Sequence, residues 1–386
     1  MADEEETKVR KVRTVVPATP VDSQRLAALK LIAGESKDIP LMSTELQPIR
    51  CVRTISPSLN RAFVMGGAPV RATYVIHGPP AAGKTAVAAL LIRSFMERGH
   101  YAGFIDAEHA VSKVWFMQLG IDPDSLLFKQ PDSFEEAVAL ADKWIFNFRK
   151  AKIDGKIPQD ACFIFVVDTI HKLAPKKEMA KLLALDPSEN KSEKKVSENI
   201  DKGWGRYRAN LISVWIDKMT PIVGKNDVAF VALAHEHDNP NKDDWGQPDY
   251  KVKGGVSLLF EAMVRIRVVS GGPLLLQRSD STKFEAGHIS RITVEKNKVG
   301  FPHETCKMFV SNGKSGTPIG FDFPRDAFTE GLDRGVIEKS GAWYTLPGGG
   351  RGQGEEKTIA LLRDNPDEYQ ALYDALLIKE NVPECT

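Results

Sequence analysis

The stretch Gly78-Pro79-Pro80-Ala81-Ala82-Gly83-Lys84-Thr85 decides how the rest of the sequence is interpreted. It follows the pattern G-x-x-x-x-G-K-[ST], in which glycines let backbone N–H groups turn towards phosphate oxygens, the lysine reaches the terminal phosphates and the hydroxyl binds Mg²⁺. The apolar run Tyr74-Val75-Ile76 precedes it, and apolar residues at helical spacing follow Lys84. A strand before the pattern and a helix after it are the required context, so we predict a nucleoside triphosphate site at this helix N-terminus.

The composition of the chain is that of a soluble globular protein. Of its 386 residues, 42% are hydrophobic and 27% are charged, which suggests roughly two or three domains. The net charge of +1 gives no overall attraction for nucleic acid, so any basic surface must be local. The four cysteines lack the spacing of a zinc site or a disulfide framework. With an acidic N-terminus and no long apolar stretch, we expect a reduced, cytoplasmic protein that is neither exported nor membrane-inserted.

Strand-like and helix-like patterns alternate from Cys51 onward. Apolar runs typical of strands buried on both faces occur at 72–77, 102–106, 161–167 and 228–234. Helical patterns lie between them, most clearly at 134–148. We therefore predict an α/β core with a mostly parallel central sheet. Two later segments, 264–268 and 291–295, alternate apolar and polar residues and are predicted to be sheet-edge strands with one wetter face.

The chain is divided into three parts by these patterns. Residues 1–50 contain a charged tail, a short helical pattern at 26–32 and a linker. Residues 51–312 form the predicted core, and residues 313–386 form a small C-terminal α+β domain. The early helical pattern suits either an arm that docks on another protein or a helix packed on its own core.

Two long polar segments are predicted to be loops, at about 176–208 and 235–256. Both follow predicted strands, at the edge where α/β sheets hold ligands. They contain cations and aromatic side chains, which binding of single-stranded DNA requires for phosphate neutralisation and base stacking. The candidates are Trp204, Arg206, Arg208, Trp245, Lys251 and Lys253. Acidic residues dilute the charge, so a solvated surface is the alternative.

Carboxylates at strand ends are the candidates for metal binding and catalysis. Asp168 ends the apolar run 163–167, where a carboxylate would hold Mg²⁺ opposite Thr85. An ordinary acidic residue at a strand end is the alternative. Hydrolysis of ATP also needs a group that orients water, and Asp106 and Glu108 both follow a predicted strand at the same edge. Spacing alone does not distinguish these two.

His235, Lys296 and Lys298 are further candidates for contact with phosphate. His235 is the first polar residue after the run 228–234, so it is predicted to contact the γ-phosphate side of the site and to report on it to the loop that follows. A solvated histidine is the alternative. Lys296 and Lys298 are two apart, which puts both on one face of a strand. They are either a pair of cations for phosphates or a solvated face.

Taken together, these motifs resemble the RecA family of homologous recombinases, over about residues 54–377. The resemblance is carried by Thr54-Ile55-Ser56, residues 78–85, Phe104-Ile105-Asp106-Ala107-Glu108-His109-Ala110, Val166-Val167-Asp168-Thr169, Glu295-Lys296-Asn297-Lys298 and Glu338-Lys339-Ser340-Gly341-Ala342-Trp343-Tyr344. The family implies ATP and Mg²⁺ as cofactors, and single-stranded and double-stranded DNA as partners. It also implies a helical filament of identical protomers, strand exchange and DNA-stimulated ATP hydrolysis.

The resemblance also assigns roles to single residues. Glu108 is implied to activate water, and Trp115 to stack on adenine. Lys296 and Lys298 are implied to reach ATP held by the neighbouring protomer, and Phe260 to lie at that interface. Gly254 and Gly255 match the glycines that close the second DNA loop. The helix at 26–32 then resembles the arm that docks on the next protomer, and the C-terminal domain resembles the one that captures duplex DNA.

The chain departs from the bacterial pattern at two positions. His235 stands where bacterial RecA has glutamine and bacteriophage recombinases of the UvsX kind have histidine. This indicates a phage-encoded protein, with a divergent bacterial protein as the alternative. Ser112 replaces an acidic residue that helps to hold adenine. Single-strand-binding or mediator proteins are further expected partners. A ring helicase with the same core and a small-molecule phosphotransferase are the rival functions, and a filament that uses ATP only for assembly is a third.

Overall fold

The computed structural model describes residue 31 and residues 49–183, 193–239, 250–277, 282–314 and 317–378. The chain forms two units, Met1–Pro48 and Ile49–Thr386, and the second contains all of the elements discussed below. The predicted helix at 26–32 is outside the described residues except for Leu31, and Trp245 is outside them as well. Within the described part, no helix has both the length and the apolar character needed to cross a membrane.

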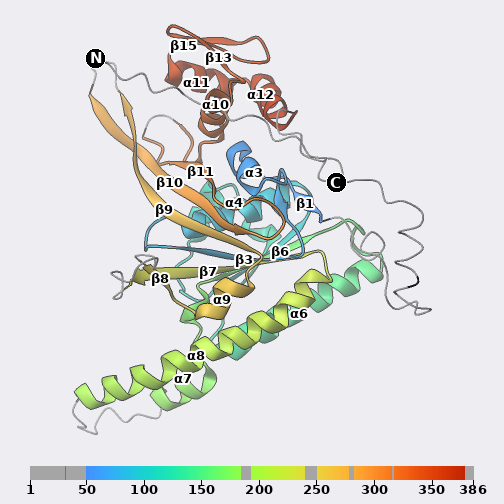
Figure 1. Ribbon diagram of the computed structural model, residues 1–386, viewed down its shortest axis with the longest axis vertical. Helices are drawn as coiled ribbons and strands as arrows, with labels where there is room; N and C mark the ends of the chain where they lie inside the picture. Colours follow the sequence, from blue (N-terminus) through green and yellow to red (C-terminus); the bar gives the residue numbers. More distant parts are fainter. Residues whose placement is uncertain are drawn as a thin grey trace. The chain divides into compact units, whose positions relative to one another are not determined.

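Parallel strands form one half of the central sheet (Figure 1). In spatial order they are β3 (Ala72–Gly78), β7 (Val228–Asp238), β6 (Phe163–Asp168), β4 (Tyr101–Asp106) and β5 (Leu126–Lys129). β3 and β6 are buried along their whole length, as strands covered on both faces must be. The predicted α/β class, its four apolar strands and its mostly parallel sheet are confirmed.

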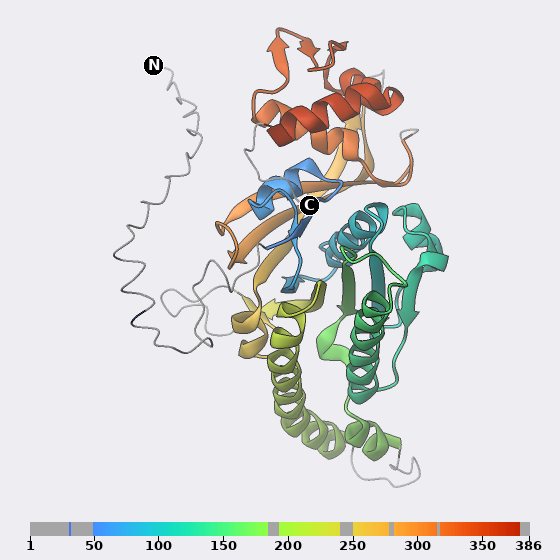
Figure 2. The same ribbon diagram turned by 90° about the vertical axis from the view of Figure 1, so that its right-hand side faces the viewer.

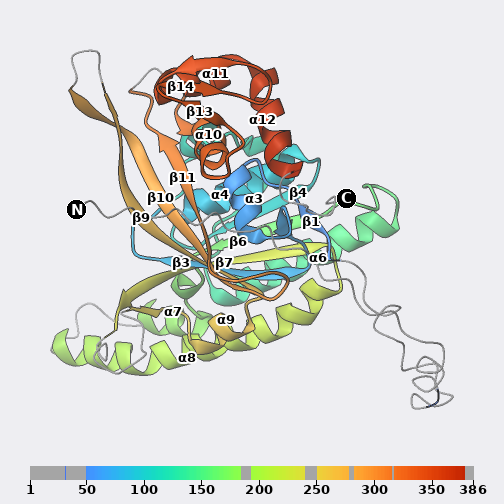
Figure 3. The same ribbon diagram turned by 45° about the horizontal axis from the view of Figure 1, so that its top comes forward.

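Beyond β3 the sheet continues with β9 (Val264–Gln277), which pairs with β3 in parallel, and then with antiparallel pairings. The strands that follow β9 are β10 (Lys283–Asn297), β11 (Glu304–Ser311) and β12 (Gly320–Phe321). Burial alternates along the first half of β9, so the wetter face that was predicted is present. The prediction that these are edge strands was wrong, because β9 pairs with both β3 and β10, and the edges are β12 and β5. The long β9–β10 ribbon is prominent in Figure 3.

Helices cover the two faces of the sheet (Figures 1 and 2). α3 (Pro57–Phe63), α4 (Lys84–Glu97) and α5 (Lys113–Gln118) pack on one core cluster. α6 (Phe134–Ile153), α8 (Glu193–Gly224) and α9 (Val256–Glu261) pack on the other. The short elements β1 (Cys51–Val52), β2 (Ala68–Pro69), the 3-10 turns η1 (Pro123–Ser125) and η2 (Ile170–Lys172), and α7 (Lys176–Leu183) complete the core.

The two predicted loops are shorter in the structure. α7 and α8 occupy most of 176–208, so the prediction of a loop there was wrong over residues 176–183 and 193–208. A mixture of both charge signs is as typical of a helix with i,i+4 pairs as it is of a loop. The second segment begins inside β7, and β8 (Tyr250–Val252) pairs back onto β7 with Glu236 opposite Val252. Only 239–249 and 253–255 lie outside regular elements or outside the described residues.

A separate small core forms near the C-terminus. It is built from α10 (Phe323–Asp333), β13 (Glu338–Ser340), β14 (Trp343–Thr345), β15 (Arg351–Gln353), α11 (Glu355–Asp364) and α12 (Pro366–Ile378). Buried polar contacts join it to α3. Ser56 Oγ donates to Asp326 Oδ2 at 2.6 Å, and Tyr373 OH donates to the Thr54 carbonyl at 2.6 Å. Asp326 is fully enclosed at this junction, with the acidic Glu330 nearby, and burial raises its pKa to about 7.

We expect Asp326 to make the protein less stable as pH rises from about 4 to about 7. The unfolded chain releases this proton near its ordinary pKa of 3.8, whereas the folded chain holds it until about 7. Asp326→Asn keeps an oxygen that accepts from Ser56 and removes the titration. It should be more stable than the wild type by about 1–3 kcal/mol at pH 8 and nearly equal at pH 4. Urea unfolding at both pH values measures this, and a parallel pH dependence in the two proteins would contradict the account.

Candidate nucleotide-binding site

Residues 78–85 connect β3 directly to α4. β3 ends at Gly78, and α4 begins at Lys84 after Gly83, whose φ of 97° is unfavourable for residues with a Cβ. Ser290 Oγ on β10 donates to the Ala82 carbonyl at 2.9 Å and lies so close that a Cβ on Gly83 would collide with it. The loop therefore has a fixed shape at the N-terminus of α4, where backbone N–H groups attract phosphate.

Lys84, Thr85 and Asp168 meet at this loop. Lys84 is buried, and its Nζ donates to the carbonyls of Gly78 (3.1 Å) and Pro79 (2.7 Å). Burial lowers the pKa of Lys84, although nearby Asp168 and Glu108 oppose that effect. Thr85 Oγ1 donates to Asp168 Oδ2 at 2.7 Å, and burial raises the pKa of Asp168 to about 6 despite this bond. A hydroxyl and a carboxylate side by side are oxygen ligands of the kind that Mg²⁺ takes, so the residues fit the implied ion.

The structure gives Asp106 and Glu108 different surroundings. Asp106 is fully buried, and its carboxylate accepts from the Val111 backbone N–H (3.2 Å) and from Gln130 Nε2 (2.9 Å). These bonds hold the turn after β4. Glu108 is half-buried, and its Oε1 accepts from Thr169 Oγ1 at 2.7 Å. Of the two carboxylates, Glu108 is therefore the one with a side chain available to a ligand at the sheet edge.

His235 reaches the same edge from β7. Its Cα pairs with that of Gly78 in the sheet register, and its Nε2 lies 3.3 Å from Glu108 Oε1. Burial lowers the pKa of His235, and Lys84 lowers it further. His171, in η2, was not among the predicted residues, yet its ring centroid is 4.9 Å from that of His235. The sequence feature that could have identified His171 is its position three residues after Asp168, which ends the neighbouring strand β6.

Comparison with known proteins identifies the family. The model of the RecA N-terminal domain matches residues 26–315, and that of the RecA C-terminal domain matches residues 327–380. The chain belongs to the RecA family. It is 32% identical to a protein named "Protein RecA" from Kineococcus radiotolerans over 342 residues, which are 89% of this chain and 86% of the relative. It is 31% identical to the "Protein RecA" of Frankia alni, over 89% of this chain and 87% of the relative. It is 30% identical to the "Protein RecA" of a Nocardioides species, over 92% of this chain and 90% of the relative.

In this RecA-family chain, Lys296 and Lys298 lie apart from the phosphate loop. Lys296 Nζ donates to the backbone carbonyl of Phe260 on α9, and Lys298 is exposed just beyond the end of β10. Among the described residues, neither lysine forms a hydrogen bond or ion pair with residues 78–85. Phe260 is 69% exposed, which is unusual for a phenylalanine in a core element. Lys298 and Phe260 are thus exposed, and half-buried Lys296 is bonded to the backbone of Phe260.

The residues predicted to contact DNA have mixed surroundings. Arg208 forms an ion pair with buried Glu178 of α7, whereas Arg206 is exposed. Trp204 packs edge-on against Tyr207 on α8, with ring centroids 5.7 Å apart. Lys251 and Lys253 are exposed, and Gly254 and Gly255 adopt φ angles of 115° and 93° just before α9. Trp115, predicted to contact adenine, is half-buried against the core cluster around α4, in a helix capped by Ser112.

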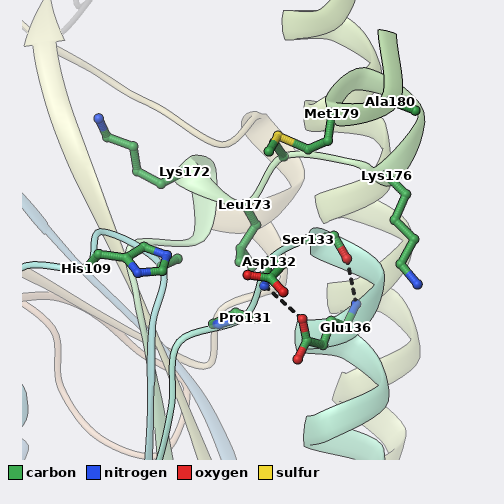
Figure 4. A pocket seen from close by; sticks show the side chains of 12 residues that line it. His109, Pro131, Asp132, Ser133, Glu136, Lys172, Leu173, Lys176, Met179 and Ala180 are labelled. Carbon is green, nitrogen blue, oxygen red and sulfur yellow. Dashed lines mark hydrogen bonds between the residues drawn. The ribbon is translucent and has the colours of Figure 1, made fainter. Parts of the chain in front are cut away.

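A pocket lies beside the turn that contains Ala107 and His109 (Figure 4), and residues 78–85 do not line it. It is bounded by the turn at Ala107 and His109, the start of α6, and the segment from Lys172 to α7. Ser133 and Glu136 line it and form the helix cap, in which Ser133 Oγ accepts from the Glu136 N–H at 3.2 Å. Cations and anions both line the pocket, so its charge does not select one class of ligand.

A buried charged network connects five strands, β3, β7, β8, β9 and β10, behind the phosphate loop. His77, immediately before Gly78, is 2.8 Å from Glu236 Oε1 and 3.2 Å from Glu295 Oε2. Arg267 pairs with Glu236 at 2.9 Å, and Tyr250 OH donates to Glu295 at 2.7 Å. Burial acts to lower the pKa of His77, but the hydrogen bonds from His77 to Glu236 and Glu295 outweigh the effect of burial, so the pKa is raised. The sequence analysis did not predict this network.

Gly83→Ala should destabilise the protein more than Gly99→Ala does. Both glycines have positive φ, 97° and 76°, so both substitutions carry backbone strain. Only at Gly83 would the new Cβ collide with a neighbour, Ser290, because nothing lies within 4 Å of a Cβ at Gly99. We expect an additional loss of about 1–3 kcal/mol at Gly83 in urea unfolding. Equal losses at the two positions would show that Ser290 does not restrict the loop.

His77→Asn should lower stability most at acidic pH. Because the folded pKa of His77 lies above the ordinary 6.5, its stabilising charge is present below pH 6.5 and is lost as pH rises through the folded pKa. We expect a loss of about 1–3 kcal/mol at pH 6 and less at pH 9. His288→Asn is the matched control with the opposite sign, since burial lowers the pKa of His288. Urea unfolding at both pH values measures the difference in free energy of unfolding between each variant and the wild type. If this difference changed with pH in the same direction for both variants, the network would be refuted.

Proposed function

We propose that this RecA-type protein is an ATP-dependent homologous recombinase that forms a helical filament on single-stranded DNA. It would pair that strand with homologous duplex, exchange strands and hydrolyse ATP at the interfaces between protomers. The exposure of Lys298 and Phe260, and the bond of Lys296 to the Phe260 backbone rather than to the phosphate loop, carry the proposal. A head-to-tail contact between copies joins two different surfaces of the protomer. An exposed lysine on one surface can therefore reach the phosphates that are bound at the other surface of the next copy.

Within one protomer, the chain supplies the phosphate-binding half of the site. The backbone of Gly78 to Thr85 would enclose the phosphates, and Lys84 would neutralise the terminal ones. Thr85 and Asp168 would hold Mg²⁺, which neutralises charge on the phosphates when bound. Glu108 would orient the attacking water, and Thr169 Oγ1 holds one of its oxygens in place at 2.7 Å. Lys296 and Lys298 of the adjacent protomer would complete the site.

His235 is suited to couple the nucleotide to the second DNA segment. It lies beside Glu108, and its backbone carbonyl accepts from the Lys253 N–H at 2.9 Å. A γ-phosphate that engages the His235 ring would thereby bias the segment that ends at Gly254 and Gly255, in the manner of nucleotide-dependent order changes. The DNA-contacting side chains we propose are Trp204, Arg206, Arg208, Trp245, Lys251 and Lys253.

The remaining parts have supporting roles in this proposal. Residues 1–50 would dock on the next protomer, and residues 313–386 would capture duplex DNA. The histidine at 235 supports a phage source with UvsX-like chemistry at the switch position. The protein would then act in the cytoplasm of a bacterial host, with single-strand-binding or mediator proteins as partners.

Glu108→Gln and Lys298→Ala should each abolish most of the ATPase activity that single-stranded DNA stimulates. The first removes a group that orients water while preserving side-chain shape, so we expect a fall of about 100-fold with ATP binding retained. The second removes a cation from the neighbouring site, with a similar expected fall. Lys307→Ala, at an exposed lysine of β11, is the control and should keep the wild-type rate. The shared site would be contradicted if single-stranded DNA did not change the rate of ATP hydrolysis, or if Lys298→Ala kept the full ATPase rate.

Imaging separates this proposal from its rivals. With an ATP analogue and single-stranded DNA, negative-stain images should show open helical filaments, coupled to strand exchange in solution. Closed rings without filaments would favour a ring helicase. Failure to bind oligonucleotide at low salt, with or without ATP, would favour a phosphotransferase, since binding to phosphates is strongest at low salt.

A further inference from the structure

Glu108, His171 and His235 form a compact group at the sheet edge. Each offers one ligand atom, and all three atoms lie within 4.8 Å of one another. Glu108 Oε1 and His235 Nε2 are 3.3 Å apart. The three residues come from the turn after β4, from η2 and from β7, so the sheet register brings them together rather than any local sequence motif.

His171 is the least explained member of this group. Both of its ring nitrogens are buried and have no hydrogen-bond partner in the part of the chain that the structure describes. A buried polar atom without a partner is costly and uncommon in folded proteins. A neutral imidazole has one ring nitrogen with a free lone pair. A ligand that accepts this lone pair would remove the part of the cost that belongs to that nitrogen.

The donor set differs from that of the Thr85 and Asp168 pair. Two imidazoles and one carboxylate are typical ligands of Zn²⁺ and of Co²⁺ or Ni²⁺, whereas Mg²⁺ takes oxygen ligands. Bonds of about 2.0–2.2 Å to a tetrahedral ion separate its ligands by roughly 3.3–3.5 Å, which the Glu108–His235 distance of 3.3 Å already matches. Thr169 Oγ1 donates to Glu108 Oε1 at 2.7 Å and so orients the carboxylate, as groups behind a metal ligand commonly do.

We propose that Glu108, His171 and His235 bind one divalent transition-metal ion of the Zn²⁺ class, with a fourth coordination position open. Binding would hold Glu108 and His235 against the ion, and both would be withdrawn from ATP hydrolysis. The metal site itself is independent of the proposed function. The inhibitory effect rests on the role proposed for Glu108, so the two parts are tested by separate readouts.

Co²⁺ is the probe for the site, because its visible absorption reports on coordination without any ATPase measurement. The full-length protein is titrated with Co²⁺ in the absence of Mg²⁺ and nucleotide, and Zn²⁺ is then added as competitor. We expect one Co²⁺ per chain with a tetrahedral or five-coordinate spectrum, which Zn²⁺ abolishes. In His171→Ala, Co²⁺ affinity should fall by about 100-fold or more. Thermal unfolding checks that each variant is folded.

Two further variants sharpen the result. His237→Ala removes an exposed histidine from the same strand as His235 and should leave Co²⁺ binding unchanged. His171→Cys should retain Co²⁺ and add an intense thiolate-to-metal band, which a purely structural role of His171 would not produce. No Co²⁺ spectrum in the wild type, or equal binding by wild type and His171→Ala, would overturn the site.

The inhibitory effect is read from the ratio of DNA-stimulated ATPase rates with and without Zn²⁺ at saturating Mg²⁺. Zn²⁺ should lower this ratio in the wild type, and the ratio should return towards one in His171→Ala. Co²⁺ binding without inhibition by Zn²⁺ would overturn the inhibitory effect while leaving the metal site established. The role of Glu108 in hydrolysis is judged separately, from Glu108→Gln without Zn²⁺.

Discussion

The register of the parallel strands is the constraint on which the site depends. Because β3, β7, β6 and β4 pair in parallel, their carboxyl ends lie along one edge. Gly78 pairs with His235, and Asp106 pairs with Asp168. A shift of one residue in any of these pairs would turn a functional side chain to the opposite face of the sheet. Backbone hydrogen bonding, more than any side-chain contact, therefore brings together the P-loop, the carboxylates and the histidines.

Behind this edge, a buried charged network ties the phosphate loop to the strands that flank it. His77 lies between Glu236, next to His235, and Glu295, next to Lys296. Buried ion pairs add little net stability compared with apolar residues, but loss of one partner leaves an expensive unpaired charge. This makes the relative positions of β3, β7 and β10 hard to change independently. Tyr250 extends the same network to β8, at the end of the segment proposed to contact DNA.

Local sequence patterns predicted the elements but not their neighbours. Residues 78–85 specify a strand, a turn and a helix by themselves, and the apolar run before Asp168 specifies a buried strand. The alternation of apolar and polar residues in 264–268 correctly predicted that one face of the strand is wetter. It carries no information on whether another strand lies alongside, so the prediction that β9 is an edge strand was wrong. Charge mixing at 176–208 was ambiguous in the same way, because exposed helices and loops share that composition.

Side chains that act through tertiary contacts were the hardest to foresee. Asp106 and Glu108 are nearly equivalent in sequence, and only the bonds of Asp106 to Val111 and Gln130 separate them in the structure. His77 carried no signal of its own and His171 only its position three residues after Asp168, since their partners come from strands distant in sequence. The pairing of β3 with β7 had to be known before His77 acquired a meaning, and the pairing of β6 with β4 and β7 before His171 did.

A mixing experiment tests the central claim, that one protomer supplies only half of the ATP site. Lys84→Ala removes the phosphate-binding half and Lys298→Ala removes the neighbouring half, so each variant alone should lack DNA-stimulated ATPase activity. In an equal mixture, an intact P-loop from one variant meets an intact Lys298 from the other at roughly a quarter of the interfaces. We predict that activity returns to about that fraction of the wild-type rate. A mixture as inactive as its two components would contradict the shared site.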